Sequence, residues 1–545
     1  MSVNFQWKSI TAKTTISSNR VLLPFVAQVA IVVAFIGVLH CPTAFSQPVI
    51  APPHEQISQD IRSISELQSD LNGIFSDPKF SNAQIGVEVR SLKNGEKLFA
   101  LNAEKNLLPA SNLKLVTTAA ALKLLGLDFR YSTQVVSSGK MVRSTLKGDL
   151  IIRGSGDPTL GSPSMFPDKD PTAIFEAWAD SLDALGIEKV DGNIIADPNY
   201  FTSDVYPLGW SIEDEPYYFA TQSSGISFAD NAVSVTVTGG LRGGSKPLYE
   251  LTPETQYFQV NDLAVTRSVS AKSIDTIRSS GNTISITRLP GENTITIQGS
   301  IDKGAEAVSE QLSVDDPPTY VATVFRETLE AHGITVTGGA MTASDLDERI
   351  NYNQTHILIN HLSPPLSDIV RVVNKKSHNH FAEQLLRTIG KEVLGKGDWR
   401  TGVLAVKRYL TLAGLDPEKV ALYDGSGLSR MDLISPSNFV QLLKTIYADP
   451  QLFSAFDSSL PVMGVDGTLS ARLRDSRASG NVHAKTGSLT GVRSLSGYLT
   501  TKDNEPLAFS IIINNYTTSG SEVQNLGDLF LLRLVNFSRL GLSGK

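Results

Sequence analysis

The sequence has almost no cysteine, since Cys41 is the single one in 545 residues. One thiol can form neither a disulfide framework nor a cysteine-based zinc site. The 8 histidines never fall in a metal-ligand spacing such as H-E-x-x-H. We therefore expect no bound metal and no cofactor.

The sequence also lacks an excess of positive charge. Its 48 Lys and Arg residues face 55 Asp and Glu residues, for a net charge of −7, and no long basic run occurs. This balance argues against nucleic acid as the main partner. With 41% hydrophobic and 19% charged residues, the composition is that of a packed globular protein, and the length suggests about three to four domains.

The first 46 residues resemble a secretory signal. Basic residues precede an apolar run, Val21 to Leu39, and Ala44-Phe45-Ser46 offers the small residues that a signal peptidase recognises. We predict a signal peptide over residues 1–46, followed by a periplasmic protein. The alternative is an uncleaved segment that anchors the chain in the membrane. No later stretch of the sequence is long and apolar enough to span one.

Three blocks of different texture follow the signal. In residues 55–127, Asn94-Gly95 predicts a hairpin turn, and a helix opens at Pro109-Ala110-Ser111 with an apolar stripe and a stop near Gly126. Residues 128–356 are rich in short β-type runs. Two helices, at about Thr172 to Leu185 and Thr319 to Ala331, are each followed by a further β-type run.

Residues 357–545 read as helices first and strands later. Helices are expected from Pro365 to Val373 and from Asn379 to Ile389, then three antiparallel strands between residues 482 and 514, and a final helix from Val523 to Phe537. We predict an α+β fold in which residues 55–127 and 357–545 form one discontinuous domain, interrupted by large inserted β-rich domains in residues 128–356.

The first motif that carries chemistry is Ser111-Asn112-Leu113-Lys114. On a helix, residues three apart share a face, so a neutral Lys114 can take the proton of Ser111 and make it a nucleophile. Lowering the lysine pKa to about 7 costs the charged form roughly 4–5 kcal/mol, which requires burial or a nearby cation. Similar spacings occur at Ser76, Ser137 and Ser144, but only Ser111 opens a long apolar helix.

Two further motifs lie in the third block. Ser377-His378-Asn379 stands between two predicted helices, where its hydroxyl and amide can relay a proton and hold a carbonyl; the alternative is a pair of helix caps. Lys485-Thr486-Gly487-Ser488 lies on a predicted strand, where a cation and a hydroxyl suit a carboxylate. The alternative is that Lys485 lies on the surface.

Ser-x-x-Lys, Ser-x-Asn and Lys-Thr-Gly in this order are the motif set of penicillin-binding proteins and serine β-lactamases. The chain resembles the D-alanyl-D-alanine carboxypeptidase/endopeptidase family, the class C low-molecular-mass penicillin-binding proteins of peptidase family S13. Further segments carry the resemblance: Leu146 to Leu150, Gly156 to Leu160, Gly209-Trp210, Asn374 to Ser377 and Asp424 to Arg430. The resemblance implies a transpeptidase/β-lactamase-like domain with insertions between the first two motifs.

The resemblance also implies roles for single residues. Ser111 would be acylated by a peptidoglycan stem peptide that ends in D-Ala-D-Ala, with Lys114 as base and Ser377 as proton relay. Asn379 would hold the peptide amide, and Lys485 with Thr486 the terminal carboxylate. The strand residues Gly487 and Ser488 would admit the substrate and complete an oxyanion hole. Asp214 would meet a side-chain amine of the substrate.

We therefore predict a serine D,D-peptidase that β-lactam antibiotics inhibit covalently. The alternatives are a serine β-lactamase or esterase with the same motifs, and a non-catalytic peptidoglycan-binding protein. We expect Arg430 to pair with Asp424 or a loop carbonyl, His483 to be exposed on an edge strand, and the other histidines to lie on the surface.

Overall fold

The computed structural model describes residues 63–268 and 282–539, all of which fall within one unit, Asp60–Lys545. The predicted signal peptide, residues 1–46, lies outside the described residues. Among the helices that are described, none combines the length and the apolar character needed to cross a bilayer.

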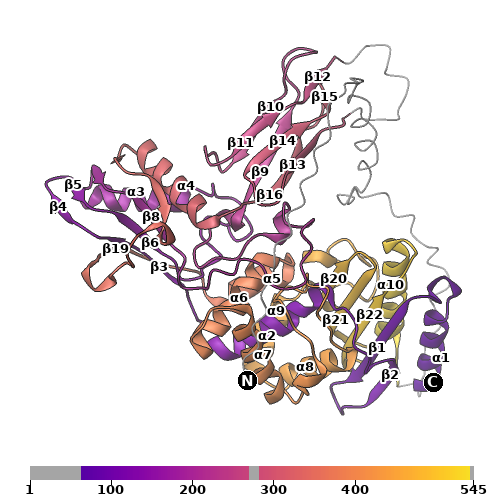
Figure 1. Ribbon diagram of the computed structural model, residues 1–545. Helices are drawn as coiled ribbons and strands as arrows, with labels where there is room; N and C mark the ends of the chain where they lie inside the picture. Colours follow the sequence, from indigo (N-terminus) through magenta and orange to yellow (C-terminus); the bar gives the residue numbers. More distant parts are fainter. Residues whose placement is uncertain (1–62, 269–281, 540–545) are drawn as a thin grey trace, which may run out of the picture. The chain divides into compact units, whose positions relative to one another are not determined.

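The site lies at the edge of an antiparallel five-stranded sheet with the order β2-β1-β22-β21-β20 (Figure 1). Its strands are β1 (Gln84–Ser91), β2 (Lys97–Leu101), β20 (His483–Leu489), β21 (Val492–Thr500) and β22 (Pro506–Asn514). The predicted hairpin and the three predicted strands are confirmed. Strand β1 pairs with β22, with Val87 opposite Ile511, so the two ends of the chain share one sheet.

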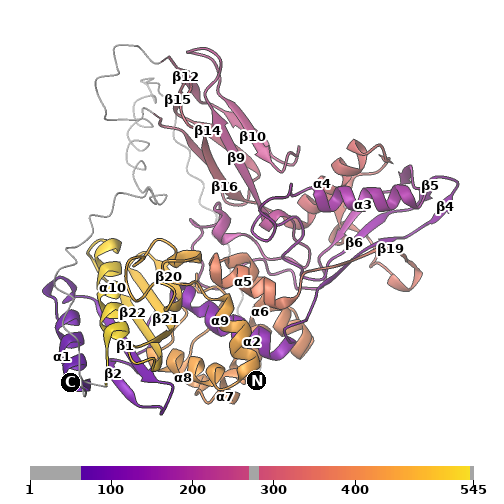
Figure 2. The ribbon, with the colours of Figure 1, turned by 180° about the vertical axis from the view of Figure 1, so that it is seen from behind.

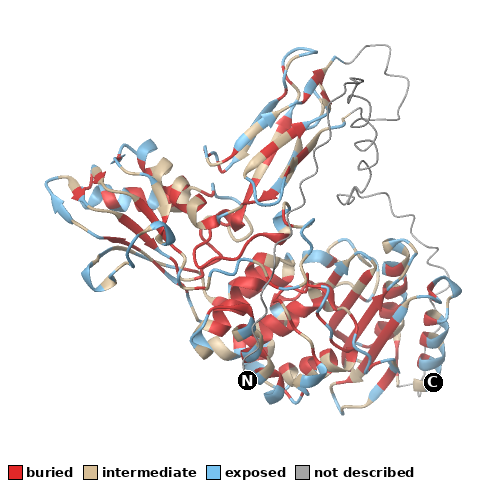
Figure 3. Cartoon of the chain, in the orientation of Figure 1, coloured by how far each residue is buried: buried red, intermediate tan, exposed pale blue. Residues whose placement is uncertain are grey.

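Helices cover both faces of this sheet, as the two opposite views agree (Figures 1 and 2). Alternate residues of β22 point to opposite faces. Ile511 and Ile513 pack with α1 (Ile64–Phe75) and α10 (Gly520–Asn536), whereas Ile512 packs with the helices on the other face. Buried residues gather on the strands of this sheet and on the helices beside it (Figure 3).

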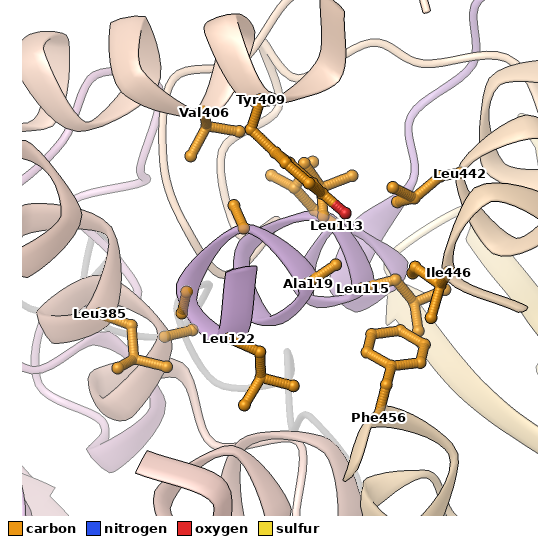
Figure 4. Close-up of a cluster of buried hydrophobic side chains, with 14 of the residues drawn as sticks. Leu113, Leu115, Ala119, Leu122, Leu385, Val406, Tyr409, Leu442, Ile446 and Phe456 are labelled. Atoms are coloured by element: carbon orange, nitrogen blue, oxygen red, sulfur yellow. The ribbon is translucent and has the colours of Figure 1, made fainter. Parts of the chain in front are cut away.

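Helix α2 (Lys114–Leu125) is buried on nearly every side. The helices around it contribute Leu385, Val406 with Tyr409, Leu442 with Ile446, and Phe456 (Figure 4). The prediction of a single apolar stripe was therefore too narrow, because a helix surrounded by other helices is apolar all round. Its C-terminal stop at Gly126 is confirmed, with φ of 90°.

The remaining helices of this part of the chain are α5 (Leu366–Lys375), α6 (Asn379–Leu394), α7 (Trp399–Leu412), α8 (Pro436–Tyr447) and α9 (Pro450–Ser459). The predictions for α5, α6 and α10 are confirmed within a few residues, whereas α7, α8 and α9 have no predicted counterpart. Helix α10 begins before its predicted start because Ser519 and Glu522 form a capping box there.

Residues 128–356 build separate sheets and a separate hydrophobic core. The strands in two of these sheets are β3 (Ser132–Ser137), β4 (Lys140–Val142), β5 (Thr145–Lys147), β6 (Leu150–Arg153), β7 (Lys189–Asp191), β8 (Ile194–Asp197), β17 (Thr335–Val336), β18 (Ala340–Thr342) and β19 (His356–Leu362). Helices α3 (Ala173–Ala184) and α4 (Pro317–Ala331) match the predictions. Strands β5 and β7, which flank α3, pair in parallel.

The other described strands of this block form smaller sheets. They are β9 (Ala232–Thr238), β10 (Leu248–Thr252), β11 (Gln259–Asp262), β12 (Val265–Arg267), β13 (Ser285–Arg288), β14 (Thr294–Gln298), β15 (Ser300–Asp302) and β16 (Val308–Ser313).

We propose that residues 55–127 and 357–545 form the discontinuous domain and that the block between them is inserted. The support is the division of the buried apolar residues into separate clusters, one of which lies almost wholly within 135–336. Strand β19 pairs with β3, so in this proposal the inserted block extends to Leu362 and does not end at residue 356.

Arg387 on α6 links the helix to the segment around residues 201–223. Its buried guanidinium donates to the carbonyl oxygens of Gly397, Asp204, Ser223 and Thr202 at 2.7–3.1 Å, between the rings of Phe201 and Trp399.

Replacing this residue by methionine, Arg387→Met, would remove the donor from the carbonyl oxygens of Thr202, Asp204 and Ser223, whereas that of Gly397 would keep the backbone N–H of Thr202. We expect the free energy of unfolding to fall by about 3–5 kcal/mol, measured by urea denaturation. The control is Arg326→Met, which removes an exposed pair with Glu330 and costs about 0.5 kcal/mol or less. Equal stability of the two variants would contradict the assignment.

Candidate active site

Ser111 and Lys114 face each other at the start of α2. A tight 3-10 turn, Ala110–Leu113, precedes the helix and begins with Ala110 in left-handed backbone at φ of 47°. Lys114 Nζ lies 2.8 Å from Ser111 Oγ, so the two side chains meet as their spacing predicts. Lys114 is fully buried, whereas Ser111 is partly exposed.

The Lys114 amine is held in a polar cage. Besides Ser111, it lies 2.6 Å from Asn379 Oδ1 and 2.8 Å from the carbonyl oxygen of Ser426. Burial lowers the pKa of Lys114 to about 7, although the negative charges of Asp424 and Glu383 oppose this shift. A substantial fraction of the amine is therefore neutral near pH 7 and can accept a proton.

Buried carboxyl groups stand behind this amine and pin the loop that carries Ser426. Glu383 on α6 accepts from the backbone N–H groups of Gly425 and Ser426 at 2.8–3.0 Å and from Trp399. Burial and the proximity of Asp424 raise the pKa of Glu383 to about 7. The loop carbonyl that meets Lys114 is therefore fixed from the other side.

Asp424 begins the same loop and closes it with further bonds. Its carboxylate accepts from the backbone N–H groups of Gly427 and Ser429 at 2.7 Å and from Trp210 Nε1 at 2.8 Å. Burial, followed by the charge of Asp424, raises the pKa of Asp432 well above its ordinary value. The shift disfavours the charged form of Asp432 beside the Asp424 carboxylate.

Ser377 and Lys485 form the second hydroxyl–amine contact of the site. Lys485 Nζ donates to Ser377 Oγ at 2.8 Å and to the carbonyl oxygen of Thr486 at 2.9 Å. Lys485 is fully buried, and burial together with the nearby Lys114 lowers its pKa well below the usual range. Ser377 lies in left-handed backbone at φ of 59°, between α5 and α6.

Strand β20 approaches the 3-10 turn closely enough to require a glycine. A Cβ on Gly487 would lie 2.2 Å from Ser494 Oγ and 2.7 Å from the carbonyl oxygen of Pro109. Ser494 in turn donates to that carbonyl at 2.6 Å. The buried Asn112 amide bridges the carbonyl oxygen of Lys485 and the hydroxyl of Ser496. These contacts hold the strand and the nucleophile-bearing turn in register.

A cavity of about 360 Å³ opens beside this arrangement. Ser111 and Ser377 line it together with Thr486, Gly487 and Ser488 of β20, and it continues toward α10. Hydroxyl groups from three distant parts of the sequence therefore face one space that is large enough to admit part of a peptide.

The structure brings together all the residues singled out in the sequence except one. Hydrogen bonds join Lys114 to Ser111 and Asn379, and Lys485 to Ser377, and the cavity that Ser111 and Ser377 line is also bordered by Thr486, Gly487 and Ser488. Asp214 is half-buried outside this set. Burial raises the pKa of its carboxyl, and the charge of Arg430 opposes the shift.

Other expectations have mixed outcomes. Arg430 donates to the carbonyl oxygen of Thr490 at 3.4 Å, a loop carbonyl as predicted. The surface assignment is wrong for His380, which is 1% exposed, and for His378, whose side chain is 10% exposed. His483 lies on the edge strand β20 as predicted, but it is half-buried and pairs with Asp457 at 2.9 Å, so the prediction that it is exposed is wrong.

Glu383 was not predicted as a site residue, although its spacing from Asn379 in the sequence is a signal for it. It follows Asn379 by four residues on α6, a spacing that puts both side chains on the same face of the helix. Asp424 lay in a recognised segment, but its bond to Trp210 joins residues that are more than 200 positions apart.

A Ser-x-x-Lys pair that meets a Ser-x-Asn segment and a Lys-Thr-Gly strand is the motif set of penicillin-binding proteins and serine β-lactamases. A model of the D-Ala-D-Ala carboxypeptidase 3 (S13) family matches residues 67–534. The chain belongs to this family and is a serine-type peptidase.

Individual proteins agree with this assignment. A D-alanyl-D-alanine carboxypeptidase of Actinomadura sp. (strain R39) is 34% identical over 490 residues, which cover 87% of this chain and 85% of the relative. Penicillin binding protein 4 (dacB) from Haemophilus influenzae has a TM-score of 0.72 at 25% identity, with 86% of this chain and 98% of that chain covered. Its complex with a β-lactam has a TM-score of 0.67 at 24% identity and the same coverage, and shows the same fold.

The close approach at β20 makes a prediction about stability. Gly487→Ala would press a methyl group into backbone atoms of the 3-10 turn, and we expect the free energy of unfolding to fall by about 1–3 kcal/mol. The measurement is a urea denaturation curve.

Gly73→Ala on α1 is the matched control, because nothing lies within 4 Å of the added methyl group. There we expect a gain of about 0.5–1 kcal/mol from helix propensity. If Gly487→Ala were as stable as the control, β20 and the turn would not be packed as described.

Proposed function

We propose that this protein hydrolyses the D-Ala–D-Ala bond of peptidoglycan stem peptides through an acyl-enzyme on Ser111. The observation that carries the proposal is the buried amine of Lys114, 2.8 Å from Ser111 Oγ and with a pKa of about 7. A neutral amine at this distance can remove the hydroxyl proton as the oxygen attacks a carbonyl.

The first half of the reaction forms the ester. Ser111 Oγ attacks the carbonyl carbon of the penultimate D-Ala while its proton passes to Lys114. The backbone N–H groups of Ser111 and Ser488 stabilise the negative oxygen that develops. Ser377, already in contact with Lys485, passes a proton to the leaving amine of the terminal D-Ala and takes up the proton that Lys114 received, so the peptide bond breaks and the Lys114 amine is neutral again.

The second half releases the product. A water molecule takes the place of the departed D-Ala and attacks the ester carbonyl, with Lys114 again accepting the proton. The bond between Ser111 Oγ and the acyl carbon breaks, and the proton returns to Ser111. The shortened stem peptide leaves with a new carboxylate.

Substrate recognition is assigned to Thr486, which lines the cavity, and to three residues outside its lining, Lys485, Asn379 and Asp214. Lys485 and Thr486 bind the terminal carboxylate, whose negative charge restores the favourable environment that burial denies to the Lys485 ammonium. Asn379 Nδ2 donates to the carbonyl oxygen of Phe219 at 2.7 Å and keeps a second hydrogen for a substrate amide. Asp214 meets a side-chain amine of the stem peptide.

β-Lactam antibiotics form a stable ester with the same serine, as the family membership and the β-lactam complex of the Haemophilus influenzae relative suggest. We further propose that residues 1–46 direct export and that the enzyme works in the periplasm. A serine β-lactamase would instead hydrolyse penicillin rapidly, and a non-catalytic wall-binding protein would not react with it.

The first test is covalent labelling with a fluorescent penicillin. We expect the wild type to form a long-lived adduct at Ser111, Ser111→Ala to lose labelling entirely, and Lys485→Ala to react about 100-fold more slowly or worse. The measurements are gel fluorescence and mass spectrometry of the labelled peptide.

Ser76→Ala is the matched control, since Ser76 precedes the exposed Lys79 by the same three residues and makes no contact with the cavity. It should label like the wild type. An unlabelled wild type refutes the proposed peptidase, and rapid turnover of penicillin supports the β-lactamase alternative.

The second test is the pH dependence of acylation. Only the neutral Lys114 amine accepts a proton, and its neutral fraction rises with pH through a pKa of about 7. The second-order rate constant should therefore be about tenfold lower at about pH 6 than at about pH 8 and level off above that.

A stopped-flow titration with a fluorescent penicillin measures this profile, and melting curves at each pH verify that the protein stays folded. Lys114→Arg should be inactive throughout, because a guanidinium keeps its proton. A flat profile between about pH 5.5 and pH 8.5 would contradict Lys114 as the base.

A further inference from the structure

The segment from Lys376 to Asn379 is held by residues of the inserted block. Lys376 Nζ donates to the carbonyl oxygen of Ser164 at 2.8 Å, and Asn379 Nδ2 donates to that of Phe219 at 2.7 Å. Between them, His378 Nε2 lies 3.2 Å from Asp230 Oδ2. All three partners come from residues 128–356. The segment that carries Ser377 and Asn379, two proposed active-site residues, is therefore held in place by a remote part of the chain.

Of these three contacts, only the one between His378 and Asp230 joins two side chains, and both are shielded from solvent. Each side chain is 10% exposed. His378 is also the N-cap of α6, where its Nδ1 accepts from the backbone N–H of Phe381 at 3.4 Å, and its ring packs on that of Phe381. In the neutral ring the hydrogen is therefore on Nε2, where it faces the carboxylate.

The loop that presents Asp230 is itself preformed. Ala229, Asp230 and Asn231 all lie in left-handed backbone, with φ of 50°, 59° and 52°. The buried side chain of Asn231 fixes this conformation by donating to the carbonyl oxygen of Gln222 at 2.9 Å and to Ser227 Oγ at 3.1 Å. The bonds of Asn231 therefore hold the loop that positions the Asp230 carboxylate against His378.

The groups around the Asp230 carboxyl favour its charged form. Burial alone would raise the pKa of the Asp230 carboxyl, but His378, Ser162 and Ser164 together lower it to about 2. The neighbouring His380 is neutral, because burial lowers its pKa to about 3. Asp230 is thus the charged partner that faces the His378 ring.

Ser377 needs such support because its own backbone is strained. A serine in left-handed backbone, at φ of 59°, persists only where its surroundings fix it. Lys485 holds its hydroxyl from one side, and the next residue, His378, is held from the other. Without the contact between His378 and Asp230, the Ser377 hydroxyl and the Asn379 amide would both be free to move.

We propose that Asp230 is a positioning residue for the proposed peptidase reaction: through His378 it holds Ser377 and Asn379 in place, so the inserted block forms part of the framework of the active site. This inference rests on the proposed function. The inserted block would then contribute to the acylation of Ser111, in addition to any contact that the block itself makes with the cell wall.

The test compares Asp230→Ala with Asp230→Asn in the full chain. The alanine removes the acceptor for His378, whereas asparagine keeps an oxygen at the same place and tolerates left-handed backbone. Single-turnover acylation by a fluorescent penicillin over a range of concentrations separates the limiting rate from the binding constant. We expect the limiting rate of Asp230→Ala to fall about tenfold or more and that of Asp230→Asn to stay within about threefold of the wild type.

Asp180→Ala is the matched control. Asp180 forms the corresponding pair with His332 at 3.4 Å inside the inserted block, with its side chain 73% exposed. This variant should acylate like the wild type. If Asp230→Ala does not fold, His378→Phe removes the same contact and keeps the ring on Phe381, and it should be slowed to the same degree.

The outcomes separate this inference from the proposed function. A wild type that is not acylated at Ser111 refutes the proposed function itself. An acylated wild type with an equally fast Asp230→Ala refutes the positioning role alone. Equal slowing of Asp230→Asn and Asp230→Ala, accompanied by equal losses of melting temperature, also refutes it, because the effect is then a general destabilisation.

Discussion

The active site depends on the burial of one amine. A lysine in water is charged at neutral pH and cannot accept a proton, so the Lys114 side chain needs an environment that penalises its charge. Helix α2 provides this environment because other helices surround it. The carboxylates of Glu383 and Asp424 keep the penalty moderate, so that the pKa settles near 7 and does not fall much further.

The same burial requires that the polar groups around the amine be satisfied by parts of the chain that are distant in sequence. Ser426 reaches Lys114 because Glu383 and Asp424 fix its loop, and Ser377 reaches Lys485 from the junction of two helices. Glycine at position 487 allows β20 to lie against the turn that carries Ser111. Few of these contacts have room to relax, which suits a site that has to hold its groups before the substrate arrives.

Much of this arrangement could be predicted from the sequence, and the part that could not has a physical reason. Ser111 and Lys114 are neighbours on one helix face, and strand β20 follows from its local pattern, so short-range geometry was sufficient. The partnership of Asp230 with His378 and the burial of His380 depend on contacts between segments about 150 residues apart, which a single sequence does not encode locally. Helices α7 to α9 were missed although the sequence carries start signals for them: Asp398, Ser435 and Asp449 are their N-caps, and the last two are followed by a proline.

The pairing of β1 with β22 has a consequence for the order of events during synthesis. Residues 84–91 leave the ribosome long before residues 506–514, so β1 can pair with β2 early but gains β22 on its other edge only when the last strands exist. A growing chain therefore carries an apolar strand with one open edge through most of its elongation, and this edge can associate with other chains until the last strands arrive. The enzyme gains its nucleophile early but can assemble the cleft around it only at the end.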